Sequence, residues 1–137
     1  MNYKPAYKYW LHLMAQTYAD EGKSQEAMTA LKDLKWIKDK LGYWSTPYDR
    51  AFFMDAAGQI YEELEKPQDA EGAYRDALEY NPHYALAHFH LGRLYLAGWR
   101  KEDALAELKI FQDEWANADL DVPEIVALRR MMDQMSR

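Results

Sequence analysis

The side chains in this sequence that could do chemistry are its histidines and a group of neighbouring carboxylates. The four histidines are His12, His83, His88 and His90. His88 and His90 stand two positions apart, and residues at that spacing on one helix point to different sides, so they cannot chelate a metal as an i,i+4 pair can. The pattern favours hydrogen-bonded or exposed histidines over a metal-binding or acid–base role.

Three carboxylates lie close together at Glu62, Glu63 and Glu65. They fall near the end of a predicted helix, where negative charge is mildly unfavourable because of the helix dipole. Two interpretations remain open for this group: an ordinary solvated face, or the acidic rim of a binding groove.

The sequence lacks the other common signatures of catalysis. Cysteine is absent, which excludes disulfides, thiolate metal sites and a cysteine nucleophile. We find no glycine-rich phosphate-binding loop, zinc-protease pair, nucleophile elbow or calcium loop. The sequence therefore predicts a protein that is not an enzyme and that uses no cofactor and no metal.

Length and charge restrict the class of protein further. A chain of 137 residues has the length of one domain. Its 23 acidic and 17 basic residues give a net charge of −6, which offers no electrostatic basis for binding a phosphate backbone. No run of 18 apolar residues is present for a membrane span, and the first residues lack the apolar region and cleavage site of a secretory signal. We expect a cytoplasmic protein with neither nucleic-acid partner nor membrane insertion.

Apolar residues recur at helical spacing along the whole chain, without convincing strand-like alternation. Glycine and proline divide this pattern into seven predicted helices. We expect these helices at about residues 5–20, 25–41, 47–65, 67–80, 82–98, 101–117 and 123–135. The predicted fold class is all-α.

One ten-residue pattern occurs three times, and its spacing gives a period. The segments are YADEGKSQEA at 18–27, YEELEKPQDA at 61–70 and YLAGWRKEDA at 95–104, each running from Tyr to Ala. The last two segments are 34 residues apart, whereas the first two are 43 apart, nine more. The extra residues are expected in an insertion at about 42–50. The chain therefore consists of repeated helix pairs.

Two glycines inside the predicted helices, Gly58 and Gly92, are also 34 residues apart. Glycine inside a helix costs roughly 1 kcal/mol relative to alanine, so both positions need a reason. Close approach of the paired helix would supply one, and Ala27, Ala70 and Ala104 are expected to be the small residues that face the glycines.

A helix-turn-helix period of 34 residues is that of the tetratricopeptide repeat, and the chain resembles this family at its defining positions. These positions are Met14, Ala15, Tyr18, Ala27, Leu31 and Leu34 in the first repeat, Gly58, Tyr61, Ala70, Tyr74, Ala77 and Pro82 in the second, and Leu91, Gly92, Tyr95, Ala104 and Leu108 in the third. The family's small residue at Ala77 becomes Phe111 in the third repeat. The resemblance implies an α-solenoid: a single domain over 1–137, with stacked repeats at about 8–41, 51–84 and 85–118 and a capping helix at about 122–136.

The resemblance also implies a site. In this family the first helix of each repeat lines a concave groove that holds a peptide or a partner's helix. The groove positions fall on Tyr9, His12, Gln16, Phe52, Asp55, Gln59, Glu62, Phe89 and Arg93, with Asp20, Glu63, Leu86 and Leu96 beside them. Members that clamp the carboxylate of a chaperone tail use Lys, Asn and Arg, and here only Arg93 agrees. The predicted groove is aromatic at its ends and acidic in the middle, which favours a partner with apolar anchors and a basic residue or two.

Several alternatives stay open. Phe52 and Phe89 could instead pack against the next repeat, and Tyr43, Trp44 and Tyr48 could form an interface or fold back onto the stack. The stripe Ile125, Leu128, Met132 and Met135 is typical of a capping helix, but a Met-rich face also suits a partner. A second function is therefore homo-oligomerisation through the terminal helices. The segment FQDEWANADLDVPEI at 111–125 resembles the closing segment of such arrays in bacterial regulators, which suggests a bacterial origin.

Overall fold

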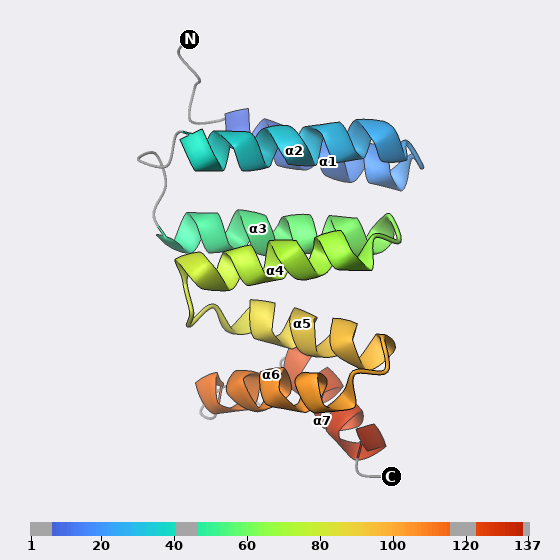
Figure 1. Cartoon of the computed structure of the whole chain (residues 1–137), viewed down its shortest axis with the longest axis vertical. Helices are drawn as coiled ribbons and strands as arrows, with labels where there is room; N and C mark the ends of the chain where they lie inside the picture. The colour runs from blue at the N-terminus through green and yellow to red at the C-terminus, as the bar shows by residue number, and fades with distance from the viewer. Residues whose placement is uncertain (1–6, 41–46, 116–122, 136–137) are drawn as a thin grey trace. The chain divides into compact units, whose positions relative to one another are not determined.

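The computed structural model describes residues 7–40, 47–115 and 123–135, and within these ranges the chain is entirely helical apart from short turns (Figure 1). Its seven helices are α1 (Tyr7–Asp20), α2 (Ser24–Lys40), α3 (Pro47–Glu63), α4 (Pro67–Tyr80), α5 (Ala85–Ala97), α6 (Lys101–Glu114) and α7 (Pro123–Met135). The all-α prediction is confirmed. Tyr43 and Trp44, and with them most of the predicted insertion, lie outside the described residues. No helix in the described ranges is long and apolar enough to cross a bilayer.

Contacts between helices divide the chain into two compact units, Met1–Asn81 and Pro82–Arg137. In the first unit α1 packs against α2 and α3 packs against α4, while α3 also contacts α1 and α2. In the second unit α5 packs against α6, and α7 contacts both helices of that pair. The predicted helix pairs and the C-terminal helix that covers the last pair are therefore present.

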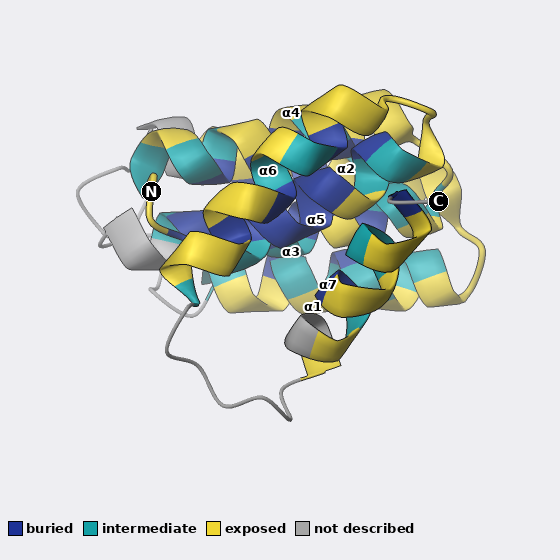
Figure 2. Cartoon of the chain, turned by 90° about the horizontal axis from the view of Figure 1, so that it is seen from below, coloured by how far each residue is buried: buried dark blue, intermediate teal, exposed yellow. Residues whose placement is uncertain are grey.

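The second helix of a pair buries one face, as α4 and α6 show, whereas α5 is buried all round from Ala87 to Gly92 (Figure 2). On α4 the buried residues recur every three or four positions, as a helix with one apolar face requires. They are Ala70, Ala73, Tyr74 and Ala77. On α6 the buried residues are Ala104, Leu108 and Phe111, which stand 34 positions after Ala70, Tyr74 and Ala77. The repeat in the sequence is thus a repeat in the core.

Both helix-interior glycines lie in close contact with the paired helix, as predicted, and the atoms nearest to them belong to larger residues than the predicted alanines. A Cβ atom on Gly58 would lie 2.6 Å from Cδ1 of Tyr74, and one on Gly92 would lie 2.6 Å from Cγ of Leu108. The carbonyl oxygen of Ala104 is farther from the Gly92 position, at 3.5 Å. Each glycine therefore makes room for a large side chain, and at Gly92 the predicted Ala104 lies close by as well.

The turn inside each pair has the same backbone geometry in all three copies. One residue of each turn has a positive φ: Gly22 at 73°, Glu65 at 58° and Trp99 at 63°. The amide of the next residue donates to the tyrosine carbonyl five positions back: Lys23 to Tyr18 at 2.8 Å, Lys66 to Tyr61 at 2.9 Å and Arg100 to Tyr95 at 2.9 Å. This hydrogen bond, together with the left-handed residue, ends a helix in the Schellman manner.

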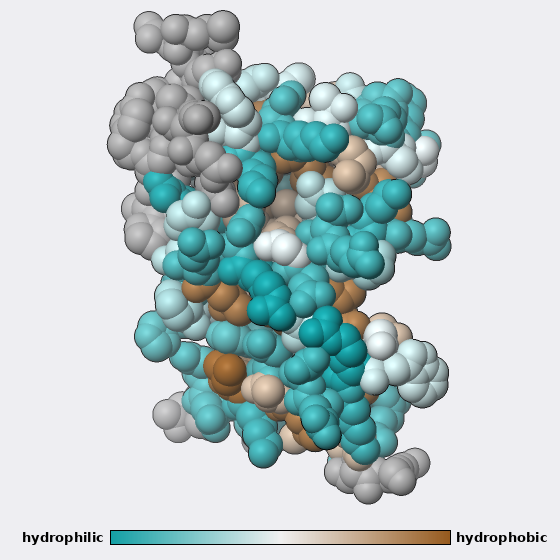
Figure 3. Space-filling view, viewed as in Figure 1, coloured by the Kyte–Doolittle hydropathy of each residue, from teal (hydrophilic) through white to brown (hydrophobic). Residues whose placement is uncertain are grey.

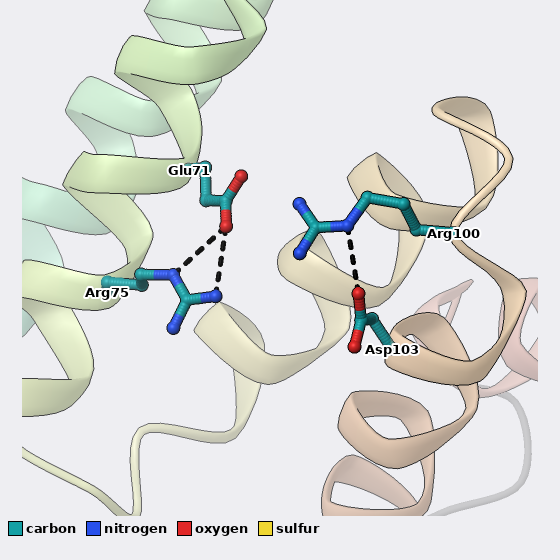
Figure 4. Close-up of polar contacts among 4 residues, drawn as sticks. All are labelled: Glu71, Arg75, Arg100 and Asp103. Carbon is teal, nitrogen blue, oxygen red and sulfur yellow. Dashed lines mark hydrogen bonds and ion pairs between the residues drawn. The ribbon is translucent and has the colours of Figure 1, made fainter.

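The basic residue that follows the turn also contacts the tyrosine ring in two of the three copies. The Lys23 ammonium lies 5.9 Å from the Tyr18 ring centroid, and the Arg100 guanidinium lies 4.2 Å from that of Tyr95. Arg100 also donates from Nε to Oδ2 of Asp103 at 2.9 Å (Figure 4). These contacts join the end of one helix to the start of the next.

In the first unit, an ion pair joins two residues of α4. Arg75 donates to Oε1 of Glu71 from Nε at 3.1 Å and from Nη2 at 2.9 Å (Figure 4). The pair has the favourable order, with the acid four residues before the base, and such surface pairs contribute a few tenths of a kcal/mol.

The fifth helix begins later than its sequence predicts. Asn81-Pro82 has the pattern of a helix start, but α5 begins at Ala85. The amide of Asn81 instead donates to the carbonyl of Ala77 and closes the end of α4. The carbonyl of Pro82 accepts from the side chain of His88 at 3.0 Å. Local hydrogen bonds over four and six positions therefore hold the predicted helix start as a connecting turn.

Candidate functional site

The predicted groove residues of α1 and α3 meet in an aromatic cluster within the first unit. The Tyr9 ring meets the Phe53 ring edge-on, with centroids 5.1 Å apart. The His12 ring lies 6.4 Å from that of Phe52 and 6.0 Å from that of Phe53. Tyr9 is 50% exposed and Phe52 is 43% exposed, whereas Phe53 is buried. Two accessible rings from neighbouring helices thus stand over a buried one.

Sequence reasoning missed two members of this cluster. Phe53 follows Phe52 directly, and it supplies the buried ring that both Tyr9 and Phe52 contact. The Lys8 ammonium lies 5.4 Å from the ring centroids of Tyr9 and Phe53. In the sequence, the position of Lys8 next to Tyr9 near the start of a predicted helix could have indicated this contact. The aromatic end of the site therefore carries a positive charge at its edge.

His12 has an unusual environment inside the cluster. Its Nδ1 atom is buried and, within the described part of the chain, has no hydrogen-bond partner. Burial lowers the pKa of His12 below the ordinary 6.5. The lowered pKa therefore favours the uncharged ring at neutral pH.

The other end of α1 is acidic and is organised by Gln16. The Gln16 amide donates to Oε2 of Glu63 on α3 at 2.8 Å and to Oδ1 of Asp20 at 2.9 Å. One side chain thus holds two exposed carboxylates from adjacent helices close together. This arrangement concentrates negative charge at the end of the site away from Tyr9.

The two other predicted acidic residues have structural contacts. Asp55 is 3% exposed and accepts from Nε2 of Gln59 at 3.3 Å. Glu62 accepts from the hydroxyl of the fully buried Tyr74 at 2.5 Å. Of the acidic residues named for this face, Glu63 and Asp20 are exposed, Glu62 is half-buried and Asp55 is buried.

The remaining predicted residues belong to the second unit. Phe89 is 5% exposed, and its ring centroid lies 5.1 Å from that of Phe111 and 5.6 Å from that of His90. Arg93 is exposed on the same helix. Within this unit Phe89 contributes to the core, whereas Arg93 is accessible from solvent.

In the second unit, His83 and His88 are hydrogen-bonded, as predicted. His83 Nδ1 lies 2.9 Å from Oε1 of Glu114. The buried His88 has Nδ1 at 2.6 Å from Oε2 of Glu107 and Nε2 at 3.0 Å from the Pro82 carbonyl oxygen. Both neighbours of His88 accept hydrogen bonds, so the two contacts favour the doubly protonated ring. In the described residues no three His, Asp or Glu side chains gather as metal ligands.

The pKa of His88 predicts a pH dependence of stability. Burial opposes the charged ring, but the hydrogen bonds to Glu107 and to the Pro82 carbonyl outweigh it and raise the pKa above 6.5. A raised folded-state pKa means that the contribution is fully present below about pH 6.5 and is lost as pH rises through the folded value.

We expect the difference in unfolding free energy between the wild type and His88→Gln to shrink as pH rises above that point. Urea unfolding at a series of pH values from about 5.5 to about 8.5 would measure this difference, and the linkage between proton binding and folding gives its sign. His83→Gln, at an exposed ion pair, is the matched control with little effect. A difference that stays constant over this range would contradict the assignment to His88.

Comparison with known proteins gives a family match and a similar fold. A family model of the tetratricopeptide repeat matches residues 61–129, just over half of the chain. A solved structure, the first tetratricopeptide-repeat domain of Spaghetti (RPAP3) bound to the HSP90 peptide SRMEEVD, matches with a TM-score of 0.66 and 20% sequence identity. The match covers 95% of this chain and 94% of that chain. No curated protein matches the sequence.

Proposed function

Because this chain belongs to the tetratricopeptide-repeat family, whose repeats serve protein interaction and are generally not catalytic, we propose that it is a binding module for a segment of a partner protein. The segment lies along α1 and α3 of the first unit. It places an apolar side chain on the aromatic cluster and a basic side chain at the Gln16-held carboxylates.

The exposure of Tyr9 and Phe52 is the observation that carries this proposal. Large rings left in water are costly, and adjacent exposed rings mark interaction surfaces. Aromatic side chains in partly enclosed positions supply a large share of the binding energy in protein interfaces. The His12 ring packs edge-on against Phe52 and Phe53 and adds a third ring to this surface.

The distance between the two ends of the site determines how far apart the apolar and the basic residue of the partner segment are. Tyr9 and Asp20 are separated by about 16 Å along α1, from the rise per residue of a helix. That distance corresponds to about five extended residues. The partner segment therefore has an apolar anchor and, about five positions away, a lysine or arginine.

The similar solved domain holds an HSP90 peptide that ends in EEVD, and binding of a peptide supports the same general class of ligand here. The specificity that we propose is different. Gln16 stands at one clamp position and already binds two carboxylates, so an acidic tail would meet negative charge. We therefore expect a basic segment rather than an acidic one.

Selection from displayed random seven-residue peptides tests the proposal. We expect the wild-type chain to enrich peptides with an apolar residue and a distant Lys or Arg, and the peptide SRMEEVD to bind more weakly than these. Phe52→Ala should weaken the selected peptides at least tenfold, which is about 1.4 kcal/mol or more. Its stability should change little, because Phe52 is 43% exposed.

Two further variants make the result specific. Trp99→Ala removes a ring that is 95% exposed in a turn of the second unit, and it should leave peptide affinity unchanged. Glu63→Lys should remove the preference for a basic residue while keeping the apolar anchor. Enrichment that is insensitive to Phe52→Ala would overturn the proposal.

Self-association remains the second candidate, and one observation favours it. Trp10 is 52% exposed and Leu13 is 63% exposed on α1, three positions apart and thus on one face. On α7 the exposed large apolar side chain among the described residues is Val126, at 38%, so α1 offers the larger exposed apolar side chains. Sedimentation over a range of concentrations would test it: a monomer at every concentration excludes this candidate.

A further inference from the structure

The ring of His88 joins three segments of the second unit. Its Nδ1 atom donates to Oε2 of Glu107 on α6 at 2.6 Å, and its Nε2 atom donates to the carbonyl oxygen of Pro82 at 3.0 Å. Within the described residues, the Pro82 carbonyl accepts no other hydrogen bond. The turn that precedes α5 is therefore tied to α6 through a side chain of α5.

Both contacts require the doubly protonated ring. Carboxylate and carbonyl oxygens only accept hydrogen bonds, and a neutral imidazole carries a single N–H group. After the loss of one proton, one ring nitrogen of His88 therefore faces an oxygen atom without a hydrogen between them. Glu107 is the charged and the closer partner, and hydrogen bonds to charged acceptors are the stronger ones. The remaining proton thus stays on Nδ1, and the contact with Pro82 is the one that breaks.

Pro82 and His83 are exposed and have few other attachments. His83 Nδ1 lies 2.9 Å from Oε1 of Glu114, but the His83 side chain is 82% exposed, and exposed ion pairs contribute little. The buried side chain of Tyr84 anchors the end of the turn next to α5. The peptide unit between Pro82 and His83 is therefore the part of the turn that depends on His88.

Two glutamates of α6 determine the charge around His88. Helices α6 and α7 pack on α5. Glu107 of α6 contacts the ring, and the charge of Glu114 also favours its protonated form. On α5 itself, the buried His90 points to a different side and Arg93 is exposed. The charged residues of α7 in the described range are all exposed: Arg129, Arg130 and Asp133.

Protons can reach this ring while the unit stays folded. The side chain of His88 is 10% exposed and that of Glu107 is 21% exposed, so the pair lies at the edge of the core. The surface over α6 is mainly hydrophilic, with small apolar patches (Figure 3). The contact can therefore respond to the pH of the solvent by a local change.

We propose that His88 is a proton-dependent latch on the connection between the two units. The doubly protonated ring holds the turn, and the singly protonated ring releases the Pro82 carbonyl to water. Asn81 is the last residue of the first unit and Pro82 is the first residue of the second. The proton on Nε2 therefore controls how firmly the connection is fixed to the second unit.

The direction of the pH response follows from the same contacts. Burial opposes the charged ring, but the hydrogen bonds outweigh it and raise the pKa of His88 above 6.5. The turn is therefore held below about pH 6.5 and is released as pH rises through the folded-state pKa. None of these residues belongs to the peptide site on α1 and α3, so the latch is independent of the proposed function.

NMR of the whole nitrogen-labelled chain between about pH 5.5 and about pH 8.5 tests the latch. The ring shifts show which nitrogen of His88 is protonated. The amide of His83 shares one planar peptide unit with the Pro82 carbonyl, so its relaxation reports the release directly. We expect His88 to lose the proton on Nε2. At the same midpoint, the order parameter of the His83 amide should fall from about 0.85, typical of rigid backbone, to below about 0.6.

Three variants separate the latch from general electrostatics. Glu107→Gln keeps an acceptor but removes the charge that favours the protonated ring, so release should move to lower pH. Asp113→Asn removes an exposed charge from the same helix and should leave the midpoint unchanged. His88→Gln has no titrating ring, so the order parameter of the His83 amide should be the same at every pH.

The proposal is overturned if His88 keeps both protons over this range, or if the neutral ring keeps its proton on Nε2. It is also overturned if the His83 amide stays rigid while the ring titrates, or if Glu107→Gln leaves the midpoint unchanged. The wild-type measurements alone decide the first three outcomes, so they do not depend on how well a variant folds.

Discussion

Replacing Phe111 by alanine is expected to lower the free energy of unfolding of the unit that contains α5, α6 and α7 by about 3–5 kcal/mol. Phe111 is fully buried, and its ring centroid lies 5.1 Å from that of Phe89 and 5.3 Å from that of Trp115. The corresponding residue of the preceding repeat is Ala77, which is also fully buried. The substitution thus restores the small residue of the family and still destabilises, because it leaves a cavity between two aromatic rings.

Urea unfolding followed by far-UV circular dichroism would measure this loss. Ile110→Ala is the matched control: the neighbouring residue is 40% exposed, so its truncation should cost less than about 1 kcal/mol. Similar losses for the two variants would contradict the assignment of Phe111 to the core of this unit.

Gly58→Ala is expected to destabilise the first unit by about 1–3 kcal/mol, because the added methyl group overpacks a closed core. The new Cβ atom would lie 2.6 Å from Cδ1 of Tyr74. The Tyr74 ring is fully buried, and its hydroxyl is fixed by Glu62, so the ring has little freedom to move aside. Gly72→Ala should have the opposite sign and stabilise by roughly 1 kcal/mol, because it gains helix propensity in open space.

A double substitution identifies the cause of the Gly58 effect. In a Tyr74→Ala background the added methyl group has room, and the cost of Gly58→Ala should fall below about 0.5 kcal/mol, a coupling typical of residues in contact. Equal costs in the two backgrounds would show that the clash is not with Tyr74.

Much of the fold could be predicted because its signals are local. Pro67 begins α4 and a glycine lies in the turn after α1, as the residue types indicate. The start of α5 could not be predicted, since Asn81 and Pro82 use their backbone groups in contacts with Ala77 and His88. Both contacts are local, but the other ring nitrogen of His88 contacts Glu107 of α6, and no local pattern in the sequence indicates that partner.

The candidate site shows the same division. The family resemblance implied that Tyr9 and His12 belong to one site, and the structure brings both to the phenylalanines of α3. Spacing could not indicate that Asp55 is buried or that Phe89 packs on Phe111. A helical period identifies a face, but the neighbouring helix decides how much of that face stays accessible.

By itself, the sequence determined the helices, their 34-residue repetition and the need for something unusual at Gly58 and Gly92. Only the tertiary structure decided that Tyr74 and Leu108 fill the spaces beside these glycines, and that the space beside Gly72 is left open. The reason is physical. Periodicity is carried by residues a few positions apart on one helix, whereas the match of a glycine to a large side chain depends on how two separate helices are placed against each other.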